Sequence, residues 1–283
     1  MEENTKKIII ISAIVVALLT IGAILYVTKF RNEDDGKRGN DPKQEQVDNY
    51  VEDRLLNLDE VVKKDKSLVQ SALKHVPYQN GLYQTIYGTG TVRLENVMKE
   101  LLFIMGYNEG VNKIEKNTEE YNKLKNDNGI ELVDFFVKTD DILKNVKKLY
   151  DVTLTDLPEE IQLIGGTATK YGDYYGFVFA SEGFGYVKIG KVLSYTSSDN
   201  SLVIYEKAAF VDYDFEERKV YVYSDDKGEN LVLTIDNEDS STSDNVLKEI
   251  KNNLSSFNTY EHVFKKDGSN YYWQSTGTTV ESK

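Results

Sequence analysis

The feature that most constrains this chain is an apolar run near its start, residues 8–28, with the sequence IIIISAIVVALLTIGAILYVT. The run has no charged side chain, and as a helix rising about 1.5 Å per residue it would be about 31 Å long. This length is close to the roughly 30 Å hydrocarbon thickness of a bilayer. The sequence therefore predicts one transmembrane helix at residues 8–28, with a short tail at residues 1–7 before it and a polar region long enough to fold after it.

A cleaved signal peptide is the alternative interpretation of this run. Signal peptides have an apolar core of about 7 to 15 residues and a small-x-small cleavage site. The run at residues 8–28 is longer and has no clean site of that kind, so we expect an uncleaved signal anchor that holds a single-pass protein in the cell membrane. It contains no ionisable side chain, which argues against a proton path or a transport site within it.

The flanks of the run point in two directions. Basic residues that follow it, such as Lys29 and Arg31, favour a cytoplasmic C-terminal domain. Lys6 and Lys7, however, directly precede the run, as in an export signal, and acidic residues 33–35 are interleaved with the later basic residues. We expect an extracytoplasmic domain, with a cytoplasm-facing membrane adaptor as the alternative.

Charge and composition exclude several classes of protein. The formal net charge of −13 makes nucleic acid a poor partner. The absence of cysteine excludes disulfides, thiolate nucleophiles, zinc ribbons and iron–sulfur clusters. His75 and His262 are the only imidazoles, so a Ser-His-Asp triad or a histidine metal site would need one of them. We expect no cofactor and no metal.

The first part of the folded region is expected to be mostly helical. Residues 29–46 are charged and contain Gly and Pro, which predicts a polar linker. In residues 47–150 apolar side chains recur with the period of a helix. The first such pattern runs from Val47 to Val76 and stops at Pro77.

Three more helices are expected in that region. Residues 94–105 carry an apolar stripe that Gly106 closes, residues 113–127 are highly charged and predict a solvated helix, and residues 139–150 begin with two acidic side chains. The apolar run at residues 130–137 fits either a helix or a strand.

Residues 151–283 are expected to form an antiparallel, β-rich region, because segments rich in Val, Ile, Tyr and Thr alternate with turn residues at intervals of about ten. The expected turns include one at residues 212–214. Strands are expected around residues 187–193 and 231–235 and in a final hairpin, and a helix near 244–254 that Ser243 or Asp244 caps would cover the sheet. The predicted fold class is therefore α+β, with a helical subdomain before a mainly antiparallel sheet.

Two stretches partly match ligand-binding motifs. Residues 185–191, GYVKIGK, match the first seven positions of a phosphate-binding loop, but Val192 stands where Ser or Thr must hold magnesium, and the alternation of the stretch predicts a strand. Residues 236–245, DNEDSSTSDN, are rich in oxygen ligands, but Ser241 and Leu247 occupy the positions where a calcium loop needs Gly and Glu. We interpret the first stretch as a strand and the second as a solvated acidic loop.

No catalytic residue is assigned from the sequence. Carboxylate pairs such as Asp212 and Asp214 are expected by chance in a chain with 47 acidic residues, and motifs such as Gly-x-Ser-x-Gly and His-Glu-x-x-His are absent. Both histidines are interpreted as structural or exposed. The 20 tyrosines suggest an aromatic interaction surface, although Tyr is also a good strand residue. The candidate surface residues are Tyr174, Tyr175, Tyr221, Tyr223, Tyr271, Tyr272 and Trp273.

These observations predict a non-catalytic, extracytoplasmic binding or interaction module of the bacterial cell envelope, with a protein or a cell-wall polymer as partner. The Lys-, Asn-, Tyr- and Ile-rich composition and the ending FKKDGSNYYW resemble those of small membrane-anchored proteins from low-GC Gram-positive bacteria, a resemblance that implies no activity. The alternative is an envelope hydrolase that uses paired carboxylates. Such an enzyme should have a pocket where two carboxyl groups, or His262 and one carboxyl group, converge with a displaced pKa.

Overall fold

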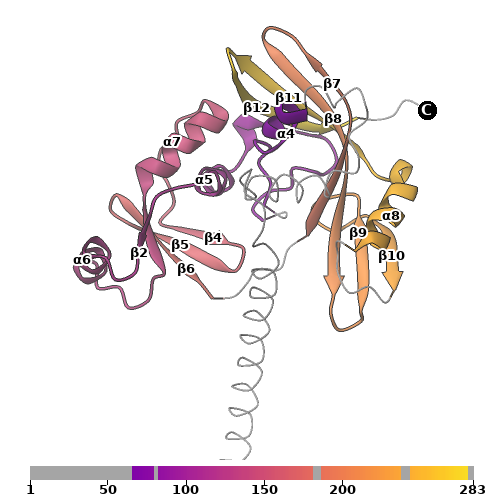
Figure 1. Cartoon of the computed structure of the whole chain (residues 1–283). Coiled ribbons are helices and arrows are strands. Elements are labelled where there is room, and N and C mark those ends of the chain that lie inside the picture. Colours follow the sequence, from indigo (N-terminus) through magenta and orange to yellow (C-terminus); the bar gives the residue numbers. More distant parts are fainter. Residues whose placement is uncertain (1–65, 80–81, 181–185, 237–242, 280–283) are drawn as a thin grey trace, which may run out of the picture. The chain divides into compact units, whose positions relative to one another are not determined.

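A computed structural model of the chain describes residues 66–79, 82–180, 186–236 and 243–279. The predicted tail, transmembrane helix and polar linker lie outside these residues, as does the helical pattern before residue 66. Among the residues described, no helix combines the length and the apolar character needed to cross a membrane. They contain five α-helices and two antiparallel sheets, which confirms the α+β class (Figure 1).

The larger sheet has seven strands in the order β1-β12-β11-β8-β9-β10, and β7 also pairs with β8. All neighbouring strands are antiparallel. The strands are β1 Thr91–Arg93, β7 Val187–Ser197, β8 Ser201–Asp214, β9 Lys219–Tyr223, β10 Leu231–Asp236, β11 Thr259–Asp267 and β12 Asn270–Thr278.

The smaller sheet has five antiparallel strands in the order β2-β3-β6-β5-β4. Its strands are β2 Lys113–Glu115, β3 Phe135–Lys138, β4 Glu160–Leu163, β5 Gly166–Tyr171 and β6 Tyr174–Phe179. The helices of the described chain are α4 Lys66–Leu73, α5 Lys99–Asn108, α6 Glu119–Asp127, α7 Thr139–Tyr150 and α8 Asp244–Asn252, with short 3-10 turns at Leu94–Asn96 and Leu254–Ser256.

Helix α5 contributes to the cores of both sheets. Its Leu101 and Leu102 pack with Trp273 and other buried residues of the larger sheet, whereas Phe103 and Ile104 pack with Phe177 and other residues of the smaller sheet. A helix that is apolar on nearly all sides is expected to be buried on nearly all sides. Helix α5 is therefore the central packing element of the described fold.

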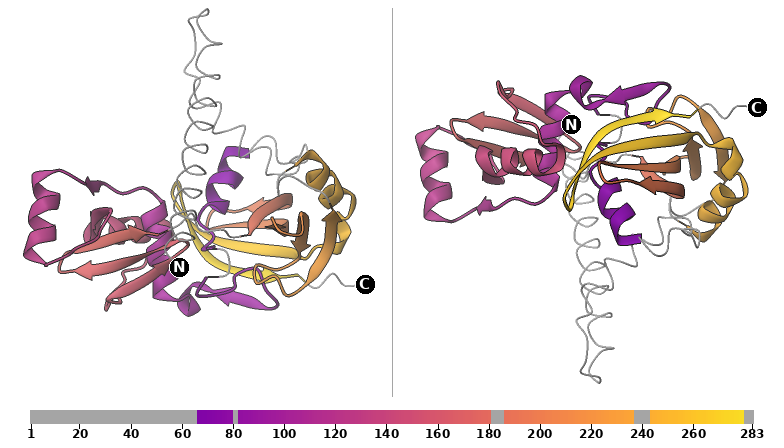
Figure 2. Two further views of the ribbon diagram at one scale, coloured as in Figure 1. Left: turned by 90° about the horizontal axis from the view of Figure 1, so that it is seen from below. Right: turned by 90° about the horizontal axis from the view of Figure 1, so that it is seen from above.

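The other faces of the two sheets carry one helix each. Val246 and Ile250 of α8 are buried against Val220 and Val222 of β9, and Figure 2 shows α8 beside this part of the sheet in both views. Tyr121 of α6 packs with aromatic residues on the outer face of the smaller sheet. Each helix buries one apolar stripe and leaves the opposite side exposed, as expected for a surface helix.

The region 47–150 is less helical than predicted where the structure describes it. Residues 113–115 form strand β2 and do not begin a helix, because Ile114 pairs with Phe136 of β3 and packs beside it. Helix α6 begins only at Glu119, where the Thr118 hydroxyl accepts a hydrogen bond from the Tyr121 N–H at 3.1 Å. Residues 135–138 form strand β3, which resolves the ambiguous run as partly strand.

The helix expected at residues 94–105 is also different. Leu94–Asn96 is a 3-10 turn, Met98 is 42 % exposed, and α5 continues through Gly106 instead of ending there. A Cβ atom on Gly106 would lie 2.6 Å from Cγ2 of Val146, so this glycine allows α5 and α7 to pack closely. It has a packing role, and the prediction that it ends the helix is wrong.

Most expectations for the second half are confirmed. Strands β7 and β10, the final hairpin and helix α8 are present, and Ser243 caps α8 by accepting a hydrogen bond from the Val246 N–H at 3.3 Å. The turn predicted at residues 212–214 is wrong, because β8 continues to Asp214 and turns at residues 215–218. Asp214 starts that turn by accepting hydrogen bonds from two backbone N–H groups.

Candidate functional site

The larger sheet forks at β8. One edge of this strand pairs with β7 from Leu202 to Val211, and the other edge pairs first with β11, up to Lys207, and then with β9, from Phe210 onward. Between these two partners Ala208 and Ala209 have no cross-strand neighbour on that edge among the residues described. The branch with β11 and β12 therefore diverges from the branch with β9 and β10.

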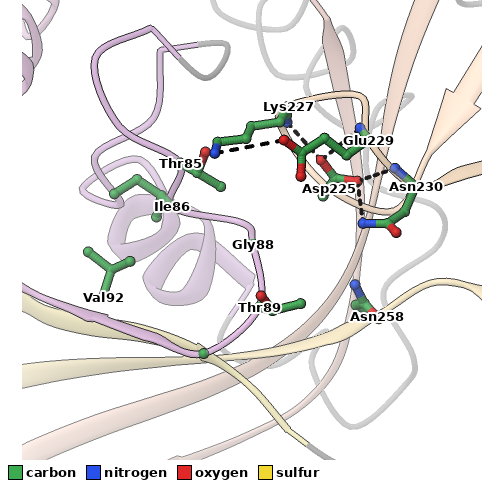
Figure 3. A pocket seen from close by; sticks show the side chains of 11 residues that line it. Thr85, Ile86, Gly88, Thr89, Val92, Asp225, Lys227, Glu229, Asn230 and Asn258 are labelled. Atoms are coloured by element: carbon green, nitrogen blue, oxygen red, sulfur yellow. Dashed lines mark hydrogen bonds and ion pairs between the residues drawn. The ribbon is translucent and has the colours of Figure 1, made fainter.

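Two adjacent cavities lie at this fork, and both are lined by Thr89 and Asn258. The first, of about 180 Å³, lies between the segment 85–92 and the loop 225–230 that joins β9 to β10 (Figure 3). The second, of about 340 Å³, reaches Lys207 of β8 and residues 255–259. We call the two cavities together the fork groove.

One wall of the fork groove is a short segment without helix or strand, residues 85–90, which we call the strap. The buried Asp226 carboxylate holds it by accepting hydrogen bonds from the N–H groups of Ile86 at 2.9 Å and Tyr87 at 3.2 Å. The Tyr260 hydroxyl donates to the Tyr87 carbonyl at 2.9 Å. Burial, and then the nearby Asp225, raise the pKa of Asp226, while the two N–H donors act in the opposite direction.

The opposite wall is the loop 225–230, which the Asp225 carboxylate organises. Its two oxygens accept hydrogen bonds from the backbone N–H groups of Lys227, Glu229 and Asn230 and from the Asn230 side-chain amide, at 2.7 to 3.2 Å. The Lys227 ammonium lies 3.9 Å from the Glu229 carboxylate (Figure 3). The carboxylate of Asp225 is thus fully used by the loop, and it has a structural role.

A buried ion cluster lies behind the strap, on the face of the larger sheet that packs against α5. Lys188 of β7 places its Nζ atom 3.0 Å from both carboxylate oxygens of Glu206 on β8. His262 of β11 places Nε2 3.1 Å from Glu206 Oε2. The strap closes the cluster through Tyr87, whose hydroxyl accepts a hydrogen bond from Lys188 at 2.8 Å.

The hydrogen bonds of the cluster continue into β12 with a defined direction. Burial lowers the pKa of His262, more than the neighbouring carboxylate raises it, so the ring is neutral. Its Nε2–H then donates to the ionised Glu206, and Nδ1 accepts a hydrogen bond from the Thr276 hydroxyl at 2.8 Å. Thr276 in turn accepts one from Trp273 Nε1 at 3.0 Å.

The carboxyl group of Glu206 is ionised despite its burial. Burial alone would raise the pKa of Glu206, but the positive charge of Lys188 and the hydrogen bond from His262 outweigh it and lower the pKa to about 2. Gly190 makes room for this carboxylate, since a Cβ atom there would lie 2.0 Å from Glu206 Oε1. The side chain therefore lies across a position of β7 that only glycine can occupy.

The order Thr276, His262, Glu206 matches the order of nucleophile, base and acid in hydrolytic triads. All three residues are 0 % exposed, however, and none of them lines either cavity of the fork groove. A substrate has no path to the Thr276 hydroxyl in this arrangement. The cluster joins β7, β8, β11, β12 and the strap, so its chemistry is that of a structural ion pair with a satisfied hydrogen-bond network.

The candidate aromatic residues do not form one surface. Tyr174 and Tyr175 lie on β6 in the smaller sheet, and the others lie on β9 and β12 in the larger one. Burial removes Tyr175 and Trp273 from any interaction surface, since both are 0 % exposed. For the five remaining tyrosines, which are partly exposed, a surface role stays a prediction.

The remaining sequence candidates have structural roles where they are described. His75 hydrogen-bonds through Nδ1 to the Tyr271 carbonyl at 2.9 Å, and the stretch that partly matches a phosphate-binding loop is strand β7 from Val187 onward. Residues 237–242 of the acidic loop lie outside the described residues. Within the ranges that the structure covers, no group of three or more His, Asp or Glu side chains is placed to hold a metal ion.

Sequence reasoning missed Lys188 and Glu206. Glu206 interrupts the apolar alternation of β8 at a position that faces the core, between Ile204 and Ala208. A carboxylate at a core-facing position of a strand needs a buried partner, so Glu206 itself was the sequence signal for a buried ion pair. The strand that supplies the partner could not be identified without the pairing of β7 with β8.

No family model, curated protein or solved structure matches the chain.

Proposed function

We propose that this chain is a single-pass membrane protein whose folded domain is a non-catalytic, extracytoplasmic binding module of the bacterial cell envelope. Residues 8–28 are the anchor in this proposal, and the fork groove is the site where a partner binds. A cell-wall polymer fits the polar groove better than a protein does, because few apolar side chains line it.

The main support for the proposal is that the acid–base side chains are buried, whereas the accessible fork groove contains no such acid–base chain among its described residues. Glu206, His262 and Thr276, the groups with the geometry of an acid–base chain, are sealed in the core. The groove is accessible, but the Asp225 carboxylate in its wall is occupied by the loop that it organises. A site of this kind supports recognition of a ligand without a chemical step.

The envelope hydrolase is the second candidate, and the ion cluster is the observation that favours it. Two neighbouring ionisable groups with displaced pKa values are a frequent sign of an active site. Catalysis would require the strap, with Tyr87, to move away from the ion cluster so that a substrate reaches Thr276. In that case a Thr276→Val variant would lose hydrolysis of its wall substrate while remaining folded, whereas a binding module has no such activity to lose.

Site-specific crosslinking in intact cells tests the proposed function. A photo-reactive amino acid is introduced into the full chain at Glu229, an exposed residue of the groove wall, and at Thr196 on the exposed part of β7 as a control. We expect an envelope component to be captured from position 229 and not from position 196. Equal capture from both positions, or protection of the domain when a protease is added outside intact cells, would contradict the proposal.

A further inference from the structure

The fork groove presents hydroxyl groups that the described fold does not use. The exposed side chains of Thr89 and Ser256 line the groove and make no hydrogen bond within the described part of the chain. The Thr85 hydroxyl also has no partner there, but its oxygen is buried in the groove wall and out of reach of a ligand. A hydroxyl both donates and accepts, so those of Thr89 and Ser256 suit a ligand that does the same.

Asn258 favours a ligand that can donate a hydrogen bond to its amide oxygen. Its amide nitrogen donates to the Ser224 carbonyl at 3.2 Å and to the Tyr260 hydroxyl at 3.4 Å, which fixes the orientation of the amide. The amide oxygen of Asn258 therefore remains as an acceptor that no described donor occupies. A phosphodiester or an ionised carboxylate cannot satisfy it, because these groups only accept hydrogen bonds.

The charged side chains that line the groove are balanced in number, with Asp225 and Glu229 against Lys227 and Lys207. Four N–H donors surround Asp225, Lys227 lies 3.9 Å from Glu229, and the buried Lys207 donates to the Phe257 carbonyl at 3.0 Å. No excess of one charge is therefore directed at the cavity. The ligand that best matches the groove is uncharged.

The size of the groove matches a short oligomer. Its cavities are about 180 and 340 Å³ and adjoin at Thr89 and Asn258, and small-molecule sites typically measure roughly 300–1,000 Å³. Few apolar side chains line it, among them Ile86 and Phe257, so it offers few apolar contacts to the side chains of a bound peptide.

We propose that the fork groove binds an uncharged, polyhydroxylated ligand, namely a short stretch of glycan of the kind found in cell-wall polymers. This inference rests on the proposed function and adds the class of ligand. Sugar hydroxyls both donate and accept hydrogen bonds, as the groove hydroxyls do, and the N–H of an N-acetyl group can donate to the Asn258 amide oxygen. Binding involves no covalent step.

Calorimetric titration of the full chain in detergent micelles tests this inference, with a β-1,4-linked tetramer of N-acetylglucosamine as the probe. We expect saturable binding whose affinity is insensitive to salt, because the ligand is uncharged. A Thr89→Val/Ser256→Ala variant should bind at least about tenfold more weakly, since each lost hydrogen bond contributes roughly 1 kcal/mol. The matched control, Thr196→Val/Ser197→Ala on β7, should bind as the wild type does.

Three results would overturn the inference. They are no heat of binding at millimolar tetramer, equal binding by the groove variant and its control, and binding of a poly(glycerol phosphate) fragment in place of the sugar with an affinity that falls as salt is added. If the tetramer fails but crosslinking from position 229 still captures a peptide or another envelope component, the ligand class is wrong and the binding module stands. If both experiments fail, the proposed function fails as well.

Discussion

The Lys188 ammonium lies 3.0 Å from both carboxylate oxygens of Glu206, a side chain that is 0 % exposed. The same carboxylate receives the His262 ring, and Lys188 also donates to Tyr87 in the strap. One ion pair therefore joins two neighbouring strands to a third strand and to the wall of the fork groove. Experiments can measure how much this ion pair stabilises the fold and whether its loss affects ligand binding in the groove.

Replacing Glu206 with Gln should destabilise the fold. The variant leaves the Lys188 ammonium, which is 21 % exposed, without an ionised partner, and removing one member of a buried pair is strongly destabilising. We expect the free energy of unfolding to fall by about 2–3 kcal/mol, less than for a fully buried pair because water reaches Lys188. Urea denaturation followed by fluorescence of Trp273, the only tryptophan, measures it.

Glu216→Gln is the matched control for that substitution. Glu216 is exposed in the turn after β8, so its replacement should change the free energy of unfolding by less than about 0.5 kcal/mol. Equal effects of the two substitutions would show that the buried pair does not stabilise the fold.

Acidification should weaken the fold first through His262. The pKa of His262 is lowered from its ordinary value of 6.5 by burial, so below pH 6.5 the unfolded chain binds a proton that the folded chain resists. Stability is therefore expected to begin to fall as the pH drops below 6.5. A His262→Gln variant should lose this slope, and a slope unchanged in the variant would assign it to other groups.

A second loss of stability should follow from Glu206. Burial opposes its ionisation, but Lys188 and His262 outweigh burial and hold its pKa at about 2, below the ordinary 4.5. The unfolded chain thus binds a proton more readily, and stability falls as the pH drops from about 4.5 toward 2. In Glu206→Gln this part of the profile should flatten. Unfolding curves at a series of pH values measure it.

Gly190→Ala should be destabilising because its Cβ atom would lie 2.0 Å from Glu206 Oε1. We expect a loss of about 2–3 kcal/mol in the free energy of unfolding, as for overpacking of a core. The loss should nearly disappear when the alanine is introduced into Glu206→Ala, where the clashing carboxylate is gone. A loss that persists in the double variant would place the strain elsewhere.

Asp226→Asn should stabilise the fold at neutral pH, in contrast to the change at Glu206. Burial raises the pKa of Asp226, and one of its oxygens has no hydrogen-bond partner in the described part, so the ionised form is disfavoured in the folded state. The asparagine oxygen can still accept from the Ile86 and Tyr87 N–H groups. We expect a gain of about 1 kcal/mol at pH 7 that shrinks as the pH is lowered and Asp226 itself becomes protonated. Loss of stability at pH 7 would contradict this.

The fold class followed from periodicity, but the pairing of distant segments did not. Helix α7 and strand β7 have clear helical and alternating patterns, and both were predicted. Strand β2 was predicted as part of a helix because it is only three residues long and is held by pairing with β3, a contact that the local sequence does not encode. Gly106 was misread because a glycine within a helical pattern signals either an end or a close contact, and only packing against Val146 decides between them.

The candidate site was less predictable than the fold. Its groove exists because β8 changes partner between Lys207 and Phe210, which depends on the return of β11 from later in the chain. The aromatic residues that composition emphasised are divided between two sheets, and Trp273 is in the core. Hydroxyl and amide side chains such as Thr89 and Asn258 are common in loops and give no signal until the fold brings them together.

The most direct test of the account compares partner capture with stability in three forms of the full chain: wild type, Thr89→Val/Ser256→Ala and Glu206→Gln. A photo-reactive amino acid at Glu229 in the groove wall reports capture in cells, and thermal unfolding reports stability. We predict that the groove variant loses capture by about tenfold with an unchanged unfolding temperature, whereas Glu206→Gln unfolds at a lower temperature and still captures the partner while folded. Undiminished capture by the groove variant, or loss of capture by folded Glu206→Gln, would contradict it.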